Sequence, residues 1–285
     1  MSIRLLALDL DGTLLNSRGQ LSEKNRQSLA AVRSQGVRVA LVTGRRFRDA
    51  RPVALELGLD VPLISHNGAL TRHARTLETI ARFSLPQATA RAALRVGREA
   101  RAGALISDER DDDALGVLIY DKQTRDSPWL AKYMAWARHL HGDDSFVRET
   151  PTLEDYVDHD PVHLTFAGFY DTMTRLQTQL DHELGTRAKV VSTLYPQLNF
   201  ALIDVLNPAA SKAVGVAAAA TELGISADEV MAIGDNFNDL EMLRYAGTGV
   251  VMGNAEPALR ESEGLHITAT NDENGVALAI ERFIL

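Results

Sequence analysis

Short apolar runs alternate with amphipathic stretches at the start of the chain. Residues 3–9 (IRLLALD) and 37–42 (VRVALV) are almost continuously apolar, which predicts buried strands. Ser22 can accept a hydrogen bond in the first turn of a helix that runs to about Gln35, and Gly36 follows where helices commonly end. Another helical stretch and a short apolar run, PLIS, come next. This alternation is typical of βαβ units and predicts a parallel sheet with helices on both faces.

The alternation stops near residue 83 and resumes near residue 206. The intervening segment begins with an Ala-rich helical stretch and continues with strands that mix apolar and polar residues, such as VHLTFAGFY and LNFALIDVL. After it, the apolar runs VMAIGD and GVVMG again alternate with helical stretches, and NGVALAIERFIL closes the chain as a helix. We therefore predict an α/β core domain built from residues 1–83 and 206–285, with an inserted α+β domain at 84–205.

Composition narrows the class of protein. The chain has 285 residues, of which 45% are hydrophobic, enough for one large or two moderate cores. Cysteine is absent, which excludes disulfides and thiolate metal sites. The net charge of −8 argues against a general nucleic-acid or anionic-membrane partner. No apolar run approaches the roughly 20 residues of a membrane span, and the N-terminus lacks the layout of a signal peptide, so we expect a cytoplasmic protein.

Polar side chains stand at the ends of four predicted strands. These side chains are Asp9 with Asp11, Thr43, Asn67 and Asp235. Ligands of open parallel sheets bind at the carboxyl ends of the strands. The fold would therefore bring these distant residues to one edge of the sheet, and we expect a functional site there.

The carboxylates in this set predict a hard cation. Asp9 and Asp11 stand two positions apart, and Gly12 breaks the strand, so both side chains can converge on one pocket. Like charges at that spacing need a cation or a shared proton. Mg²⁺ prefers oxygen ligands, and Asp235, in the acidic stretch GDNFND, would complete a site with Asp9. Asp-Gly and Asn-Asp are also common turn residues, but two such motifs at two strand ends favour the metal site.

Two further features suit an anionic ligand. Thr43 and Gly44 lie between a strand and a helix, where a hydroxyl and free backbone N–H groups can bind phosphate, although Thr43 alone would be read as an ordinary helix cap. Lys212 begins a helix of small residues, where a cation opposes the helix dipole and needs a reason such as a nearby anion. A solvated surface lysine is the alternative.

Taken together, these residues resemble the haloacid dehalogenase superfamily, and within it the Cof-type phosphatases. The resemblance rests on DLDGT (9–13), LVTGR (41–45), Lys212 and GDNFND (234–239), in that order. HNGA (66–69), VVMGNA (250–255) and TNDENGVA (270–277) add subfamily features. The resemblance implies a Rossmann-like parallel-sheet core in which the inserted domain is an α/β cap.

The resemblance also implies a role for each matched residue. Asp9 would be the nucleophile that forms an aspartyl-phosphate. Asp11 would be the general acid and base, and its backbone carbonyl would bind Mg²⁺. Asp235 would be a further metal ligand. Asp239 is also expected among the metal-site residues, where it would orient Lys212 or metal-bound water. The residues expected to hold the phosphoryl group or substrate are Thr43, Gly44, Arg45, Asn67, Lys212 and Asn238.

The function that follows is a Mg²⁺-dependent phosphatase of small phosphorylated metabolites, such as sugar phosphates, pyridoxal phosphate or flavin mononucleotide. The cap would cover the site and select the leaving group. A phosphomutase with the same chemistry and a non-catalytic module that binds a phosphometabolite stay open as alternatives. Asp11 and the absence of a membrane span argue against an ion pump of the same superfamily. We expect a monomer or a homodimer.

Overall fold

The computed structural model describes residues 2–110, 114–195 and 199–285, and the chain divides into two compact units. The core unit comprises Met1–Arg82 and Ser211–Leu285, and the inserted unit comprises Phe83–Ala210. The boundaries expected from the sequence, at 84 and 205, lie one and five residues from these.

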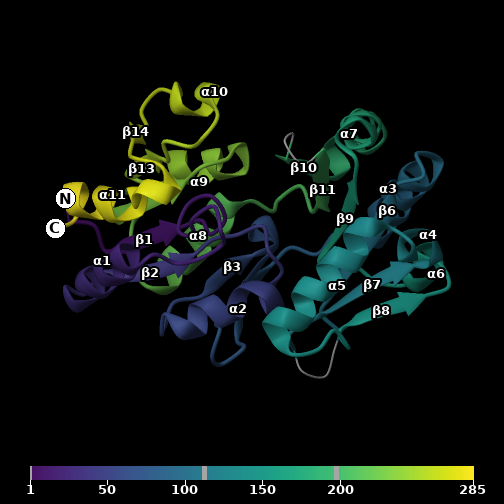
Figure 1. Ribbon diagram of the computed structural model, residues 1–285, viewed down its shortest axis with the longest axis horizontal. Coiled ribbons are helices and arrows are strands. Elements are labelled where there is room, and N and C mark those ends of the chain that lie inside the picture. The colour runs from purple at the N-terminus through teal and green to yellow at the C-terminus, as the bar shows by residue number, and fades with distance from the viewer. Residues whose placement is uncertain (1, 111–113, 196–198) are drawn as a thin grey trace. The chain divides into compact units, whose positions relative to one another are not determined.

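The core unit is built on a parallel five-stranded sheet (Figure 1). Its order is β14 (His266–Ile267), β13 (Thr248–Val251), β12 (Val230–Gly234), β1 (Leu5–Leu8) and β2 (Arg38–Leu41). All four neighbouring pairs run parallel. Every residue of β1 and β12 is buried, which requires cover on both faces of the sheet. The predicted parallel α/β architecture is therefore confirmed.

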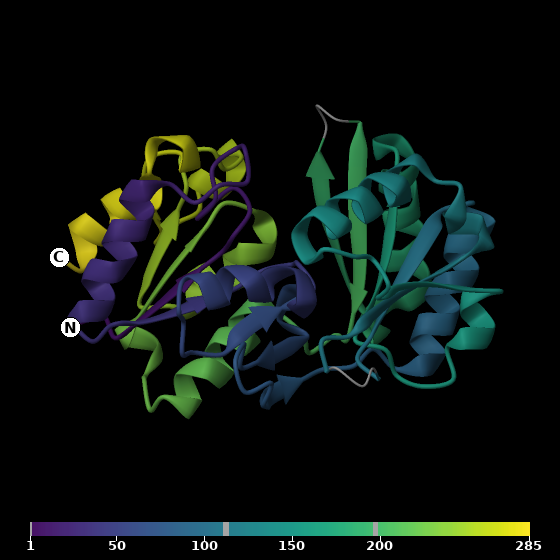
Figure 2. The same ribbon diagram turned by 60° about the horizontal axis from the view of Figure 1, so that its bottom comes forward.

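Helices supply that cover. They are α1 (Glu23–Ser34), α2 (Phe47–Glu56), α8 (Lys212–Glu222), α9 (Leu240–Tyr245), α10 (Pro257–Arg260) and α11 (Gly275–Phe283). Helices α8 and α9 pack on the face that carries Leu5 and Ala7, whereas α1 and α11 lie side by side (Figure 2). The Ser22 side chain caps α1 by accepting a hydrogen bond from the Asn25 N–H at 3.2 Å, as expected.

The chain departs from the predicted pattern after β3 (Leu63–Ser65). Sequence alternation made this strand part of the parallel sheet, but only a single bridge, between Val42 and Ile64, pairs it in parallel. The strand instead pairs antiparallel with β4 (Leu70–Arg72), which pairs with β5 (Thr79–Arg82). The physical reason is the short 3₁₀ turn His66–Gly68, whose residues all have positive φ, at 53°, 54° and 91°. This turn reverses the chain.

The inserted unit has a six-stranded sheet and its own core. The sheet order is β10 (Lys189–Tyr195), β11 (Phe200–Leu206), β9 (His163–Gly168), β6 (Gly103–Asp108), β7 (Val117–Asp121) and β8 (Val147–Thr150). Only β7 and β8 pair in parallel. The helices are α3 (Gln87–Glu99), α4 (Lys122–Arg125), α5 (Pro128–His141), α6 (Leu153–Tyr156) and α7 (Tyr170–Leu184).

Close packing explains a glycine inside α3. A β-carbon on Gly97 would lie 2.1 Å from the Phe166 ring, so only glycine lets the helix approach β9 this closely.

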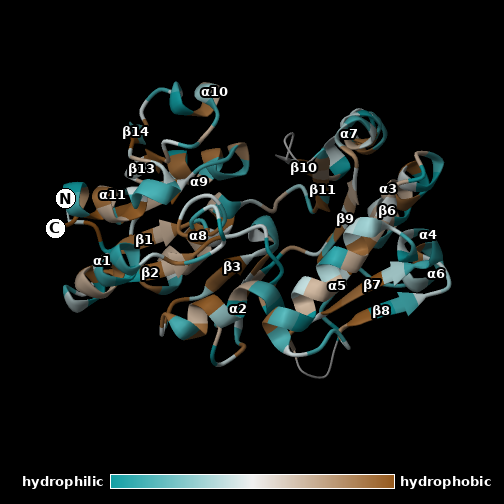
Figure 3. Ribbon diagram, in the orientation of Figure 1, coloured by the Kyte–Doolittle hydropathy of each residue, from teal (hydrophilic) through white to brown (hydrophobic). Residues whose placement is uncertain are grey.

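The strands at the centre of the core unit are hydrophobic, as the hydropathy colouring of β1 and β3 shows (Figure 3). Within the described part of the chain, every helix is too short or too polar to span a membrane.

Asp108, a buried carboxylate of the inserted unit, leads us to expect that the stability of the fold depends on pH. Burial raises the pKa of Asp108, but hydrogen bonds from the Tyr156 hydroxyl (2.5 Å) and the Arg110 backbone N–H (2.9 Å) outweigh it and hold the pKa below its usual value. Such a carboxylate stabilises the fold above its unfolded pKa and loses that contribution as pH falls through its folded pKa.

We therefore expect an Asp108→Asn variant to be less stable than the wild type at neutral pH. The difference in free energy of unfolding should shrink as pH falls below about 4, because protonated Asp108 then resembles asparagine. Denaturant unfolding of both proteins between pH 3 and 7 measures it. A difference that stays constant over that range would contradict this account of Asp108.

Candidate functional site

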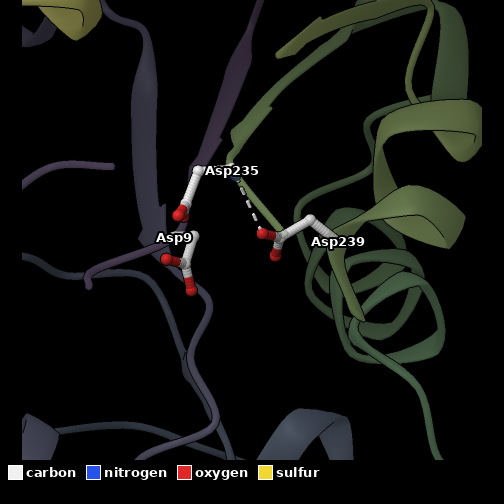
Figure 4. Close-up of side chains that lie close together, drawn as sticks. All are labelled: Asp9, Asp235 and Asp239. Atoms are coloured by element: carbon white, nitrogen blue, oxygen red, sulfur yellow. Dashed lines mark hydrogen bonds between the residues drawn. The ribbon is translucent and has the colours of Figure 1, made fainter. Parts of the chain in front are cut away.

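Three carboxylates meet at the carboxyl edge of the central sheet. Asp9 follows β1, Asp235 follows the adjacent strand β12, and Asp239 ends the short 3₁₀ turn Phe237–Asp239. One oxygen from each lies within 4.8 Å of the others (Figure 4). The residues come from segments more than 200 positions apart, and parallel pairing of β1 with β12 brings them together. Their position is the sheet edge at which ligands of such folds bind.

Lys212 lies among these carboxylates. Its Nζ donates to Asp9 Oδ1 at 2.7 Å and to Asp239 Oδ1 at 2.6 Å, and its side chain is only 2% exposed. It is the first residue of α8, and the Ser211 side chain caps that helix by accepting from the Val214 N–H. Lys212 is therefore a buried ion-pair residue, not a solvated lysine, and two anions offset its unfavourable place at a helix N-terminus.

Asp239 uses both of its oxygens within the protein. Oδ2 accepts from the backbone N–H groups of Asp235 and Asn236, each at 3.1 Å, and Oδ1 accepts from Lys212. The side chain is completely buried. A β-carbon on Gly234 would lie 2.5 Å from Asp239, so glycine is needed here for the carboxylate to reach back under the strand end. This arrangement makes Asp239 a fixed support for Lys212 and for the turn after β12.

The charges of this cluster do not balance. If all three carboxylates were ionised, they and the Lys212 ammonium would carry a net charge of −2. Burial raises the pKa of Asp9 well above its usual value, in spite of Lys212. Burial, together with the nearby charge of Asp239, raises the pKa of Asp235 to about 7. Burial would lower the pKa of Lys212, but Asp239 and Asp9 raise it above its ordinary value. A site of this kind favours an added divalent cation.

The Asp11 carboxylate is bound by Arg45 and does not belong to the cluster of Asp9, Asp235 and Asp239. Sequence reasoning allowed it to converge with Asp9, but Arg45 donates to both of its oxygens, from Nε at 2.7 Å and from Nη2 at 2.6 Å. The Asp11 side chain is 52% exposed. The planar guanidinium matches the two carboxylate oxygens, which explains why the isolated protein holds this orientation.

The turn after Asp9 is shaped by Gly12, which the sequence predicted to break the strand, and by Thr13, which received no role from the sequence. Gly12 has φ of +82°, and a β-carbon there would lie 2.2 Å from Asp235 Oδ2. Thr13 is fully buried and donates from Oγ1 to Asp235 Oδ1 at 2.8 Å. The motif DLDGT contains both residues, but only the folded structure shows that they contact Asp235.

The remaining predicted residues form a connected group beside the carboxylates. Thr43 Oγ1 accepts from the Arg45 N–H at 3.1 Å, and the Thr43 carbonyl accepts from the Asn67 N–H at 3.1 Å. Asn238 donates from Nδ2 to Asn67 Oδ1 at 2.9 Å, and a β-carbon on Gly44 would lie 3.1 Å from that oxygen. Asn238 Oδ1 is buried with no hydrogen-bond partner among the described residues. A buried polar atom of this kind is one that a ligand or water can satisfy.

Gly68 connects this group to Lys212. Its φ is +91°, and a β-carbon there would lie 1.9 Å from the Ser211 carbonyl oxygen. Gly36 has a similar φ of +86° but no atom within 4 Å of the equivalent position. An alanine at either position would be strained by the positive φ, but only at position 68 would its β-carbon also clash with another atom.

We expect Gly68→Ala to cost about 1–3 kcal/mol more stability than Gly36→Ala, because it forces the start of α8 away from the 66–68 turn. Denaturant unfolding of the two variants compares them directly. Equal losses of stability would show that α8 does not depend on this close contact.

Comparisons with known proteins identify the family of the chain. A family model described as haloacid dehalogenase-like hydrolase matches residues 6–280. The putative phosphatase YxeH of Bacillus subtilis is 29% identical, over 99% of this chain and 98% of the relative. An HMP-PP phosphatase of Escherichia fergusonii is 32% identical, over 90% of this chain and 86% of the relative. The crystal structure of a haloacid dehalogenase-like hydrolase from Bacteroides thetaiotaomicron superposes with a TM-score of 0.80 at 27% identity, covering 99% of both chains.

Proposed function

The chain belongs to the haloacid dehalogenase-like hydrolases, and from that premise we propose that it is a Mg²⁺-dependent phosphatase that works through an aspartyl-phosphate on Asp9. It is a phosphatase of this superfamily. The observation that best supports the finer proposal is the buried contact of Lys212 with Asp9 and Asp239 beside Asp235. A nucleophile with a fixed cation and uncompensated negative charge suits phosphoryl transfer.

Asp9 has one carboxylate oxygen available for attack. Oδ1 accepts from Lys212, whereas Oδ2 has no hydrogen-bond partner among the described residues. In the proposed first step an Asp9 oxygen forms a bond to phosphorus, and the bond from phosphorus to the alcohol oxygen breaks. Lys212 holds Asp9 in place and stabilises the charge on the phosphoryl oxygens.

Asp11 would move the protons of both steps. It would give a proton to the departing alcohol and then take one from the water that attacks the aspartyl-phosphate, which releases inorganic phosphate and restores Asp9. Such assistance is worth roughly 10²–10⁴-fold. The ion pair with Arg45 must open for Asp11 to reach the leaving group.

The residues present fit Mg²⁺. The available donors are all oxygens, and a divalent cation would balance the net charge of −2 that the ionised cluster would carry with Lys212. Asp9, Asp235 and the backbone carbonyl of Asp11 would hold the ion, while Asp239 acts through Lys212 because both of its oxygens are already hydrogen-bonded. When bound, the ion supplies positive charge that neutralises the transferring phosphoryl group.

The group around Thr43 would bind the phosphate of the substrate. Thr43 and Gly44 offer a hydroxyl and a backbone N–H, and Arg45 adds a guanidinium. The carboxamides of Asn67 and Asn238 already touch each other and can turn toward a phosphoryl oxygen. Lys212, which contacts Asp9, would complete this phosphoryl-binding set.

The substrates proposed are small phosphorylated metabolites. Sugar phosphates, pyridoxal phosphate and flavin mononucleotide follow from the Cof-type resemblance, and a relative named HMP-PP phosphatase adds that compound to the panel. The inserted unit would select among leaving groups. A single small-molecule substrate class needs no nucleic-acid or membrane partner.

Release of inorganic phosphate from this panel, with Mg²⁺ and with EDTA, tests the proposal. We expect Mg²⁺-dependent release from at least one compound and loss of release with EDTA, restored by added Mg²⁺. Transfer that depends on a bisphosphate activator and releases little phosphate would instead indicate a phosphomutase. Tight binding without phosphate release would indicate a non-catalytic module.

A further inference from the structure

Three asparagine side chains hold the loop that carries Asp11. This loop, residues 10–15, leaves β1 and turns under the site. The carboxamide Nδ2 atoms of Asn254, Asn25 and Asn271 donate to its backbone carbonyls. The contacts are Asn254 to Gly12 at 2.9 Å, Asn25 to Leu14 at 3.2 Å, and Asn271 to Leu15 at 2.9 Å. Three of the six carbonyls in the loop are therefore bound by side chains from elsewhere in the chain.

The same carboxamides bind the C-terminal segment. Asn254 Oδ1 accepts from the backbone N–H of Asn271 at 3.0 Å, and Asn25 Oδ1 accepts from that of Ala277 at 3.1 Å. Asn271 lies in the short 3₁₀ turn Asn271–Glu273, just before α11. Asn25 and Asn271 are buried, whereas Asn254 is exposed. The asparagines thus connect the loop after β1 to the end of the chain.

The hydrogen bond from Asn254 reaches the loop at Gly12, the residue that follows Asp11. Gly12 has a positive φ, and its carbonyl belongs to the peptide that joins Gly12 to Thr13. Thr13 in turn donates to Asp235. A hydrogen bond from Asn254 to the Gly12 carbonyl therefore fixes the orientation of the Gly12–Thr13 peptide, one residue beyond Asp11 and next to the residue that contacts Asp235.

We infer that Asn254, with Asn271 and Asn25 behind it, is a positioning residue that aims Asp11 at the leaving group. The inference rests on the proposed function, because it concerns the proton transfer assigned to Asp11. It also gives a physical role to VVMGNA and TNDENGVA. In the part of the chain that the structure describes, the Asn254 and Asn271 side chains of these motifs bind backbone groups and form no hydrogen bond with a carboxylate of the cluster.

The test uses substitutions that remove one donor and little else. Asn254→Asp keeps the shape and the acceptor for Asn271 but replaces the amide that binds Gly12. Asn254→Ser removes the same amide donor without adding charge, and its shorter side chain also withdraws the acceptor of the Asn271 N–H. Asn16→Asp is the matched control, because Asn16 Oδ1 only accepts, from the Arg18 and Gln20 N–H groups, in the turn that follows the loop.

Each variant is assayed with two substrates that differ in their need for an acid. p-Nitrophenolate leaves without protonation, whereas the sugar alcohol of glucose 6-phosphate needs a proton from Asp11. The ratio of kcat/KM for the two reports on departure of the leaving group and is insensitive to later hydrolysis of the intermediate. Thermal unfolding of each variant accompanies the assay.

For both Asn254 variants we expect kcat/KM to fall about 10-fold or more further with glucose 6-phosphate than with p-nitrophenyl phosphate. The unfolding temperature should stay unchanged. Asn16→Asp should keep the wild-type ratio. Equal losses on both substrates, or an unchanged ratio in the Asn254 variants, would overturn the positioning role. A wild type that releases phosphate with Mg²⁺ neither from these two substrates nor from any compound of the panel above would overturn the proposed function and the inference with it.

Discussion

An Asp9→Asn variant is expected to lose turnover by roughly 10⁴-fold or more while it remains folded. The carboxamide is a poor nucleophile, so the covalent route closes. Folding should survive because Asp9 is a buried carboxylate whose pKa burial raises, and removing its charge relieves part of the repulsion from Asp235 and Asp239. Lys212 keeps Asp239 as a partner. Phosphate release and thermal unfolding measured on the same preparation check both parts.

Asp11→Asn serves as the control that separates the nucleophile from the proton carrier. With p-nitrophenyl phosphate, whose leaving group needs no acid, this variant should still transfer the phosphoryl group to Asp9. Hydrolysis of the intermediate should then slow by roughly 10²–10⁴-fold, which gives a burst of p-nitrophenol equal to the amount of enzyme. Asp9→Asn should give no burst. Appreciable steady turnover by Asp9→Asn would sink its assignment as nucleophile.

A Lys212→Met variant is expected to lose both stability and activity. Methionine has a similar length but no charge, so Asp9 and Asp239 would stay buried without their shared cation. Removal of one partner from a buried ion pair typically costs about 3–5 kcal/mol. Phosphoryl transfer should slow by roughly 10²–10³-fold, the scale seen when a preorganised charge donor is removed. Denaturant unfolding in EDTA and phosphate release with Mg²⁺ measure the two effects.

The double variant Lys212→Met/Asp239→Asn distinguishes charge balance from catalysis. It removes one anion along with the cation, so it should recover part of the lost stability and none of the activity. The single variant Asp239→Asn completes the cycle. If the double variant were as unstable as Lys212→Met, the charge of Lys212 would not be what offsets the burial of Asp239. Recovered activity in the double variant would contradict the catalytic role of Lys212.

Local patterns were sufficient to predict the framework of this site. The apolar runs before Asp9 and Asp235 are continuous because both strands are buried on two faces, and such runs signal central strands of a parallel sheet. Ser22 caps α1 through a bond to Asn25, a contact that depends only on neighbouring residues. Strand ends then place the carboxylates at one edge without any knowledge of side-chain contacts.

Features set by distant contacts could not be predicted in the same way. The 66–68 turn, which redirects β3 into a hairpin, depends on positive φ at His66 and Asn67 as well as glycine. The direction of Asp11 depends on Arg45, which reaches it from another strand end. Asn254 binds Gly12 across 242 positions. Residue identity suggests such contacts only after the fold has brought the partners together.

The most direct test of the account is to find where the phosphoryl group is during turnover. Wild-type protein and Asp11→Asn would be mixed with Mg²⁺ and p-nitrophenyl phosphate, quenched in acid and mapped by peptide mass spectrometry. The account predicts one phosphoryl group on the peptide that contains Asp9, and none on Asp9→Asn. A phosphoryl group on any other residue, or continued phosphate release by protein that never becomes phosphorylated, would contradict it.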